Sequence, residues 1–160
     1  MKGFEDEVYR YLWLLSNVTA IFLLFITIKW PRIGRVLFFL LFAWASWMNW
    51  TTAIEKPSIY LDYGRLTWSS VYRNFIYGWF SMHITEVVKT IATGQVLIAT
   101  GILLNGWIMK ISVIAAIVFL LAIVPLGIGS GFPTTLIMTI ALMALLRKHS
   151  SQFIWRPSME

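Results

Sequence analysis

The chain has 160 residues, of which 59% are hydrophobic and only 12% are charged, and its net charge is +6. A water-soluble domain typically has roughly 25% charged residues, so this composition excludes a soluble globule and favours an integral membrane protein. The absence of cysteine excludes disulfides, thiolate metal sites and thiol-based redox chemistry within this chain. The basic residues lie beside apolar runs rather than in one block, which is typical of membrane anchoring and argues against nucleic-acid binding.

Five apolar stretches predict an all-α integral membrane protein with five transmembrane helices in a single membrane domain. About 20 apolar residues in a helix cross a hydrocarbon core of roughly 30 Å. The expected spans are residues 11–30, 36–53, 85–104, 107–125 and 133–146. The polar, acidic N-terminus lacks the basic start and the cleavage pattern of a signal peptide, so we expect the first span to remain in the mature chain.

The segments between the spans have distinct compositions. Pro31 to Arg35 contains Pro and Gly and is predicted to be a tight polar connection. Residues 55–84 form the one long non-spanning segment, an outer loop in which the aromatic residues 71–80 are expected to form a helix lying in the membrane interface. Gly127 to Gly131 is expected to be a flexible loop, and Pro133 suits the first turn of the last span.

The distribution of basic residues predicts the orientation of the chain. An odd number of spans places the two termini on opposite sides of the membrane. More basic residues are expected beside the inner face, as is typical of membrane proteins. With the C-terminus inside and the N-terminus outside, the inner side collects Lys29, Arg32, Arg35, Lys110, Arg147, Lys148 and Arg156. We therefore expect a multi-pass protein of a cell membrane, typically the bacterial inner membrane.

Charged side chains at the start of the third span are the first candidates for a ligand-binding site. His83, Glu86 and Lys89 are three residues apart and therefore neighbours on one helix face, and Gln95 continues the polar character deeper into the span. Because charged groups inside a bilayer are costly, they are functional candidates. The structural alternative is that Lys89 extends to the interface and Glu86 stabilises the helix start.

The second span carries two further candidates for the same ligand. Asn49 lies on one helix face with Ser46 and Ala53, and Lys56 follows one turn beyond. Polar and small residues on one face of a membrane helix usually mediate helix–helix contact through hydrogen bonds. The alternative interpretation is a pocket that Asn49 shares with Glu86.

Catalytic and metal sites are not predicted. His83 and His149 are expected near opposite membrane faces, so they cannot jointly hold a haem iron. With no cysteine and no cluster of carboxylates, metal binding by this chain alone is not expected. Since no serine pairs with an embedded histidine and acid, we expect no catalytic site in this chain on its own.

Three features occur from the second span onward: an apolar helix that closes in Trp50-Thr-Thr-Ala-Ile-Glu-Lys-Pro57, Glu86 after an aromatic loop, and a Gly-spaced helix from Gly94 to Gly106. Through these features, residues 36–147 resemble the DoxX-like family of small bacterial membrane proteins. The resemblance implies a four-helix DoxX-like core, to which this chain adds its N-terminal span. It also implies that Lys56 and Glu86 lie nearest a ligand or partner. The family's usual glycine before the lysine is replaced here by the residues from Trp50 to Ala53.

Three functions are consistent with these features. The first, which follows the family resemblance, is a non-catalytic membrane subunit or accessory protein of a redox or quinone-linked complex. The second is a binding protein for a small lipophilic ligand, a quinone or a lipid, with a pocket near Glu86. The third is a small transporter formed by an oligomer. Membrane lipids and other membrane subunits, or further copies of the chain, are the expected partners.

Overall fold

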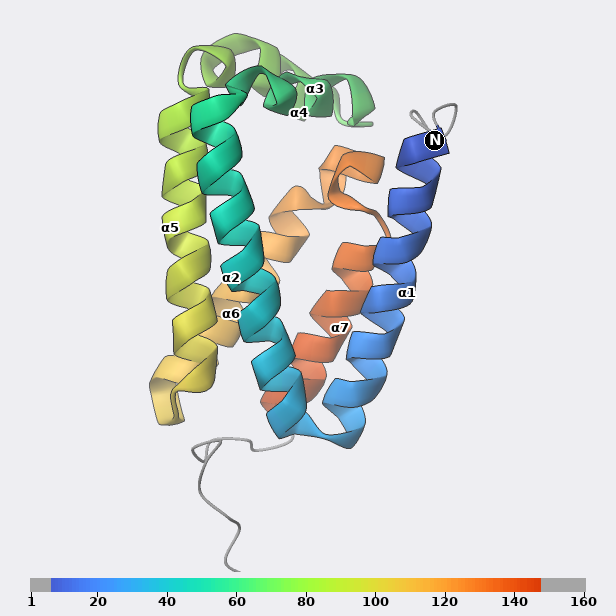
Figure 1. Ribbon diagram of the computed structural model, residues 1–160, viewed down its shortest axis with the longest axis vertical. Helices are drawn as coiled ribbons and strands as arrows, with labels where there is room; N and C mark the ends of the chain where they lie inside the picture. The colour runs from blue at the N-terminus through green and yellow to red at the C-terminus, as the bar shows by residue number, and fades with distance from the viewer. Residues whose placement is uncertain (1–6, 148–160) are drawn as a thin grey trace, which may run out of the picture.

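The computed structural model describes residues 7–147, and all of its secondary structure over that range is helical. Five long or apolar helices and five short helical segments make up the described residues (Figure 1). The elements are α1 (Glu7–Lys29), α2 (Pro31–Glu55), η1 (Pro57–Leu61), α3 (Asp62–Leu66), α4 (Ser70–Phe75), η2 (Ile76–Phe80), α5 (Ile84–Leu103), α6 (Gly106–Ile123), η3 (Val124–Ser130) and α7 (Thr134–Arg147). The predicted Lys148, His149 and Arg156 lie outside the described residues.

The five main helices pack as a closed ring. In order around the ring, α1 contacts α2, α2 contacts α5, α5 contacts α6, α6 contacts α7, and α7 returns to α1. The short segments of residues 57–80, which we call the cap, lie across one end of this ring (Figure 1). The helix α1 begins at the capped end, and α7 ends at the opposite end (Figure 1).

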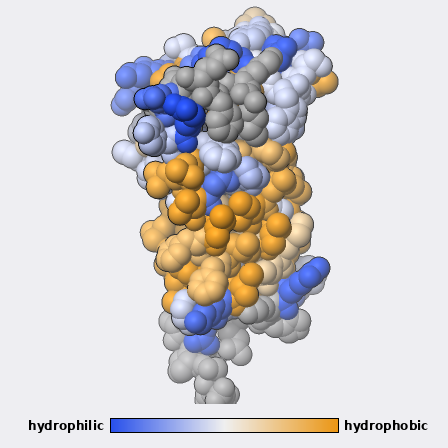
Figure 2. Space-filling model, turned by 90° about the vertical axis from the view of Figure 1, so that its right-hand side faces the viewer, coloured by the Kyte–Doolittle hydropathy of each residue, from blue (hydrophilic) through white to orange (hydrophobic). Residues whose placement is uncertain are grey.

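The surface of the bundle is apolar between two polar ends, as expected for a membrane protein. Four helical segments are long and apolar enough to cross a membrane, namely Arg10–Lys29, Pro31–Glu55, Ile84–Leu103 and Gly106–Ser130. Large apolar side chains such as Trp47 and Leu97 are more than half exposed along them, and the face in Figure 2 shows a hydrophobic band between hydrophilic ends. Such a large exposed apolar surface is unstable in water. The predicted all-α, membrane-type fold is therefore confirmed.

The helix α7 is shorter than the other four. Its 14 residues rise by about 21 Å, less than the thickness of a hydrocarbon core. It is apolar and packs along α1 and α6. The prediction of a fifth crossing therefore depends on a helix that is short for a membrane span.

The second helix is longer than predicted. The connection expected at Pro31 to Arg35 is the first part of α2, which leaves Trp30 alone between two helices. Pro31 occupies the first turn, where a missing N–H costs nothing. Gly34 lies against α1, because a Cβ atom there would come within 2.6 Å of Thr27 Oγ1. The close helix pair explains why Pro and Gly do not interrupt the helix here.

The cap contains several short helices where one interfacial helix was expected. Residues 71–80 are divided between α4 and η2, and the backbone of Gly78 has non-helical angles. The Arg73 guanidinium ties α4 to α3 by donating to the carbonyl oxygens of Gly64 at 3.2 Å and Thr67 at 3.1 Å. The loop expected at Gly127 to Gly131 largely belongs to η3, which contacts α3 beneath the cap.

The interior of the ring is solid at the end opposite the cap. All five main helices contribute to one cluster of buried apolar side chains there. Its largest fully buried members are Phe38, Ile102, Met109, Val113, Leu142 and Leu145. Small residues such as Ala99, Ala116 and Ala141 let the helices approach closely around them. A second, smaller cluster lies directly under the cap, and the space between the two clusters is the candidate site.

Candidate functional site

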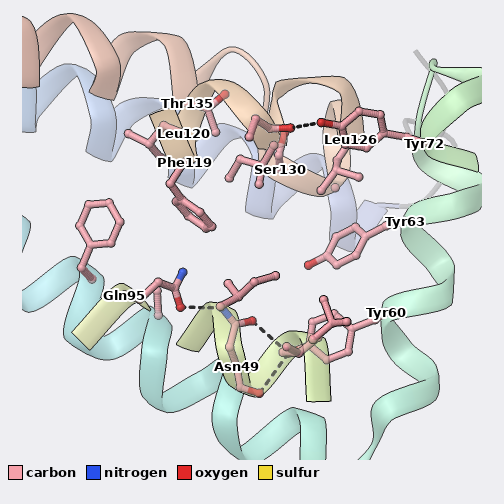
Figure 3. A pocket seen from close by; sticks show the side chains of 18 of the residues that line it. Asn49, Tyr60, Tyr63, Tyr72, Gln95, Phe119, Leu120, Leu126, Ser130 and Thr135 are labelled. Atoms are coloured by element: carbon pink, nitrogen blue, oxygen red, sulfur yellow. Dashed lines mark hydrogen bonds between the residues drawn. The ribbon is translucent and has the colours of Figure 1, made fainter. Parts of the chain in front are cut away.

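A cavity of about 650 Å³ lies inside the ring on the capped side of the solid core. Side chains from α2, α5, α6, η3 and α7 form its walls, the cap lies over it, and it is open on the side of the exposed Trp44. Figure 3 shows these walls facing one another across the cavity. Ligand sites in proteins typically occupy about 300–1,000 Å³ and are mostly apolar. The cavity therefore has the size of a small-molecule site.

The walls of the cavity are apolar and aromatic. Phe42 of α2 and Phe119 of α6 meet edge to face at 6.1 Å between ring centroids, and Phe75 and Phe80 of the cap line the upper part. Among the described residues, no Asp, Glu, Lys, Arg or His lines the cavity. A charged ligand would therefore enter without a counter-charge, which is costly in an apolar environment.

One chain of polar side chains interrupts the apolar wall. The Tyr60 hydroxyl donates to Asn49 Oδ1 at 2.9 Å, and Asn49 Nδ2 donates to Gln95 Oε1 at 2.9 Å (Figure 3). Tyr60 belongs to the cap, Asn49 to α2 and Gln95 to α5. Next to this chain, Ser46 Oγ donates to the Ala92 carbonyl at 2.7 Å. These bonds hold α2 against α5, as interhelical polar side chains commonly do in membranes.

Tyr60 is held in its neutral form. Its side chain is 7% exposed, and burial, with a smaller contribution from the nearby Tyr63, raises the pKa of Tyr60 to about 12. Removal of the phenol from water disfavours the phenolate. At neutral pH, Tyr60 is therefore a hydrogen-bond donor to Asn49 and fixes the direction of the polar chain.

Hydroxyl groups lie on the opposite wall. Ser130 Oγ donates to the Gly127 carbonyl at 2.9 Å, Thr134 Oγ1 donates to Ser16 Oγ at 3.1 Å, and the Tyr72 hydroxyl donates to the Ala122 carbonyl at 2.6 Å. The Thr135 oxygen is fully buried and has no hydrogen-bond partner in the described structure. Three of these hydroxyls are thus already engaged with the protein.

A second hollow of about 420 Å³ adjoins the cavity between α1, the cap and η3. The two hollows share Tyr63, Gly129 and Ser130 as lining residues. The ring of Tyr63 rests on Gly129, where an added Cβ atom would lie 2.5 Å from the ring. The absence of a side chain at Gly129 therefore allows the Tyr63 ring to stand between the two hollows.

Two of the six residues predicted to bind a ligand lie at the cavity. Asn49 and Gln95 both line it and are hydrogen-bonded to each other. The sequence placed them on different helices without indicating that they meet. Asn49 makes a hydrogen bond between two helices and also lines the cavity, but Glu86, with which it was predicted to share a pocket, does not line this cavity.

The other four predicted residues do not line the cavity. Glu86 is exposed in the first turn of α5, and Lys56 is exposed just after α2. His83 stacks on Trp79 with ring centroids 4.5 Å apart, and the Lys89 ammonium lies 5.4 Å from the Trp50 ring centroid. In α5 the buried face carries Val88, Ala92 and Gln95, whereas Glu86 points to another side of the helix.

Several cavity residues were not foreseen. Tyr60, Phe119 and the hydroxyl residues of η3 and α7 come from segments that show no polar pattern of their own in the sequence. The aromatic composition of residues 55–84 was the available signal, but it indicated an interface rather than a lid over a cavity. Only the packing of the cap onto the ring brings Tyr60 to Asn49.

Comparison with known proteins gives no relative. No protein-family model matches the chain, and neither a curated protein nor a solved structure shows significant similarity to it. The resemblance to the DoxX-like family therefore stays a prediction from the sequence, as do the roles that it implies for Lys56 and Glu86.

Proposed function

We propose that this protein binds a small lipophilic molecule inside its membrane-spanning bundle. The observation that supports the proposal is the 650 Å³ cavity, whose walls are apolar except for the chain of Tyr60, Asn49 and Gln95. A large apolar pocket with a few convergent polar groups is the usual form of a small-molecule site. The bilayer is the natural source of a ligand that fits such walls.

The proposal includes a protein that crosses the membrane five times, with its N-terminus outside and its C-terminus inside. Four basic residues expected on the inner side, Lys29, Arg32, Lys110 and Arg147, belong to helix ends opposite the cap. The apolar η3 segment directly precedes α7 and lies beneath the cap, so η3 and α7 together make the fifth crossing longer than α7 alone. The basic end then faces the cytoplasm, in keeping with the preference of basic residues for that side.

The other two predicted functions have no comparable support. An accessory subunit of a redox or quinone-linked complex needs a contact surface for its partner, and the exposed apolar side chains of α2 and α6 suit lipid equally well. A transporter formed by an oligomer would need a polar path, whereas the walls of the cavity are apolar. Both functions stay predictions, and the binding of a lipophile is the function that the geometry favours.

Native extraction tests this proposal. We expect the full chain, extracted from its own membranes in polymer-bounded lipid discs, to carry one lipophile enriched over bulk lipid, as measured by mass spectrometry. Ala45→Phe places a ring in the cavity wall and should lower the bound amount at least several-fold. Met48→Phe is the matched control, because Met48 lies on the same helix but does not line the cavity. Equal lipophile content in both variants and the wild type would contradict the proposal.

A further inference from the structure

We infer that the ligand is an uncharged lipophile whose carbonyl oxygen accepts a hydrogen bond from the side-chain amide of Gln95. This inference rests on the proposed function, because it names the class of molecule that the same cavity binds. Two independent features support it: an unused donor on the cavity wall, and the absence of charge around that donor.

The unused donor follows from the direction of the polar chain. Tyr60 donates to Asn49 Oδ1, and Asn49 Nδ2 donates to Gln95 Oε1. A glutamine amide has one oxygen that accepts and one nitrogen that donates two hydrogens. Since the oxygen of Gln95 faces Asn49, its nitrogen is turned away from Asn49 and points into the cavity, toward Phe119 (Figure 3).

No group of residues 7–147 accepts a hydrogen bond from that nitrogen. Gln95 is only 3% exposed, and no acceptor for its Nε2 atom occurs among the described residues. The hydroxyls of Ser130, Thr134 and Tyr72 already donate to other protein atoms, and the unpaired hydroxyl of Thr135 lies on the opposite wall of the cavity. A donor that faces an apolar cavity without a hydrogen-bond partner is unfavourable. A ligand that brings an acceptor to Gln95 removes this penalty.

A carbonyl oxygen meets this requirement better than a hydroxyl or a carboxylate. It accepts a hydrogen bond and has no hydrogen of its own that would need a partner in an apolar cavity. A carboxylate would need a counter-charge, and the basic side chain nearest in sequence, Lys89, packs on Trp50 and does not line the cavity. Esters, ketones and quinone rings share the required chemistry.

Matched probes of one chain length separate these classes. The full chain in phosphatidylcholine nanodiscs is titrated with methyl oleate, oleate and (Z)-9-octadecene, which share an 18-carbon chain with a cis double bond at carbon 9 and carry a methyl ester, a carboxylate or neither. A benzoquinone with a short prenyl tail and the corresponding prenylbenzene test a ring carbonyl in the same way. We expect at least one carbonyl probe to bind roughly three- to tenfold more tightly than its carbonyl-free counterpart, and oleate to bind less tightly than methyl oleate.

Substitution of Gln95 tests the hydrogen bond itself. Gln95→Met keeps the length of the side chain and removes the donor, so we expect the preference for the carbonyl probe to disappear while the hydrocarbon binds as before. Thr93→Val is the matched control on the same helix, because Thr93 is exposed and does not line the cavity. This control should keep the full preference.

A measurement on the wild type keeps the inference testable if Gln95→Met does not fold. The infrared carbonyl band of ¹³C-labelled methyl oleate, or of the labelled benzoquinone, should shift to lower frequency on binding. An unshifted band, or equal binding of carbonyl and carbonyl-free probes, would overturn the inference and leave the proposed function standing. If none of the probes binds, the proposed function fails together with the inference.

Discussion

The two ends of the bundle use the same five helices in different ways. At the end opposite the cap, buried apolar side chains such as Phe38, Ile102 and Leu142 pack together in the interior of the ring. At the capped end, the ring contains a partly open cavity, and α1 and α2 diverge as they approach that end (Figure 1). The comparison shows that a solid core at one end can hold the helices in place while the other end remains open to a ligand.

The difference has a physical origin in side-chain size and polarity. Small residues bring the helices together at the solid end: Gly34 lies against Thr27, and Gly101 lies against Ser112. At the capped end, amide and aromatic side chains hold α2 and α5 together but leave the centre unfilled. Because dense packing stabilises a fold and a void does not, we expect stability to be concentrated at the solid end.

The largest effect is expected at Arg35, which closes the solid end. Its side chain is fully buried, and its guanidinium donates to the carbonyl oxygens of Ile102, at 2.9 Å, and Leu104 at the end of α5. Arg35→Met removes both bonds and leaves the two carbonyls unpaired. We expect the free energy of unfolding to fall by about 3 kcal/mol, measured by denaturant unfolding in lipid discs.

Arg32 provides the control for this substitution. It is exposed three residues earlier on the same helix, so Arg32→Met should change the free energy of unfolding by no more than about 0.5 kcal/mol. Equal losses in both variants would show that the solid end does not depend on the buried guanidinium.

A smaller effect is expected where α5 meets α6. A Cβ atom at Gly101 would overlap the Ser112 hydroxyl and lie 2.9 Å from Ser112 Cβ, so Gly101→Ala should lower the free energy of unfolding by about 2 kcal/mol. The double variant Gly101→Ala, Ser112→Gly should recover part of the free energy of unfolding that Gly101→Ala loses. At Gly94 on the same helix, an added Cβ meets nothing within 4 Å, and Gly94→Ala should be neutral or stabilising. Equal thermal shifts in the two alanine variants would refute the close contact.

The smallest effect concerns Tyr60 at the capped end and depends on pH. Its pKa of about 12 in the folded protein lies above the ordinary value of 10.0. Between these two values the unfolded state loses the proton first, so this contribution to stability is complete below pH 10 and is lost as pH rises to about 12. Tyr60→Phe should lower the free energy of unfolding by about 1 kcal/mol at neutral pH. The variant should also lack the part of the decrease in stability between pH 10 and 12 that Tyr60 causes.

Comparison of unfolding curves from pH 9 to 12 measures that difference directly. Tyr11→Phe is the control, because Tyr11 is 72% exposed on α1 and should leave the alkaline profile unchanged. If Tyr60→Phe follows the wild-type profile throughout, then Tyr60 does not hold the cap to Asn49.

The predictions from the sequence were most accurate for the apolar helices and least accurate for what joins them. The spans at 85–104 and 107–125 agree closely with α5 and α6, because a long apolar run has only one stable form in a bilayer. Pro31 to Arg35 was predicted as a connection, since the local rules for Pro and Gly do not register the contacts of Gly34 and Arg35 with other helices.

The candidate site shows the same limit. Charge singled out His83, Glu86, Lys89 and Lys56, all of which lie away from the cavity, whereas Asn49 and Gln95 were chosen for their polarity within a span and do line it. A polar residue in the middle of an apolar helix is therefore the more informative signal here. Charged residues at helix ends can stack on aromatic rings or remain exposed to water at the membrane interface, so they need no binding site.

The amino-acid sequence by itself determined that the protein lies in lipid, that it is helical, and where its four long helices approximately begin and end. These properties follow from hydrophobicity and from the need to pair backbone amides within each segment, and both act locally. Tertiary structure alone decided that Arg35 is buried, that the cap folds over the ring, and that Tyr60, Asn49 and Gln95 form one hydrogen-bonded chain. Such contacts join residues up to 69 positions apart, and they depend on which helix faces meet rather than on any local pattern.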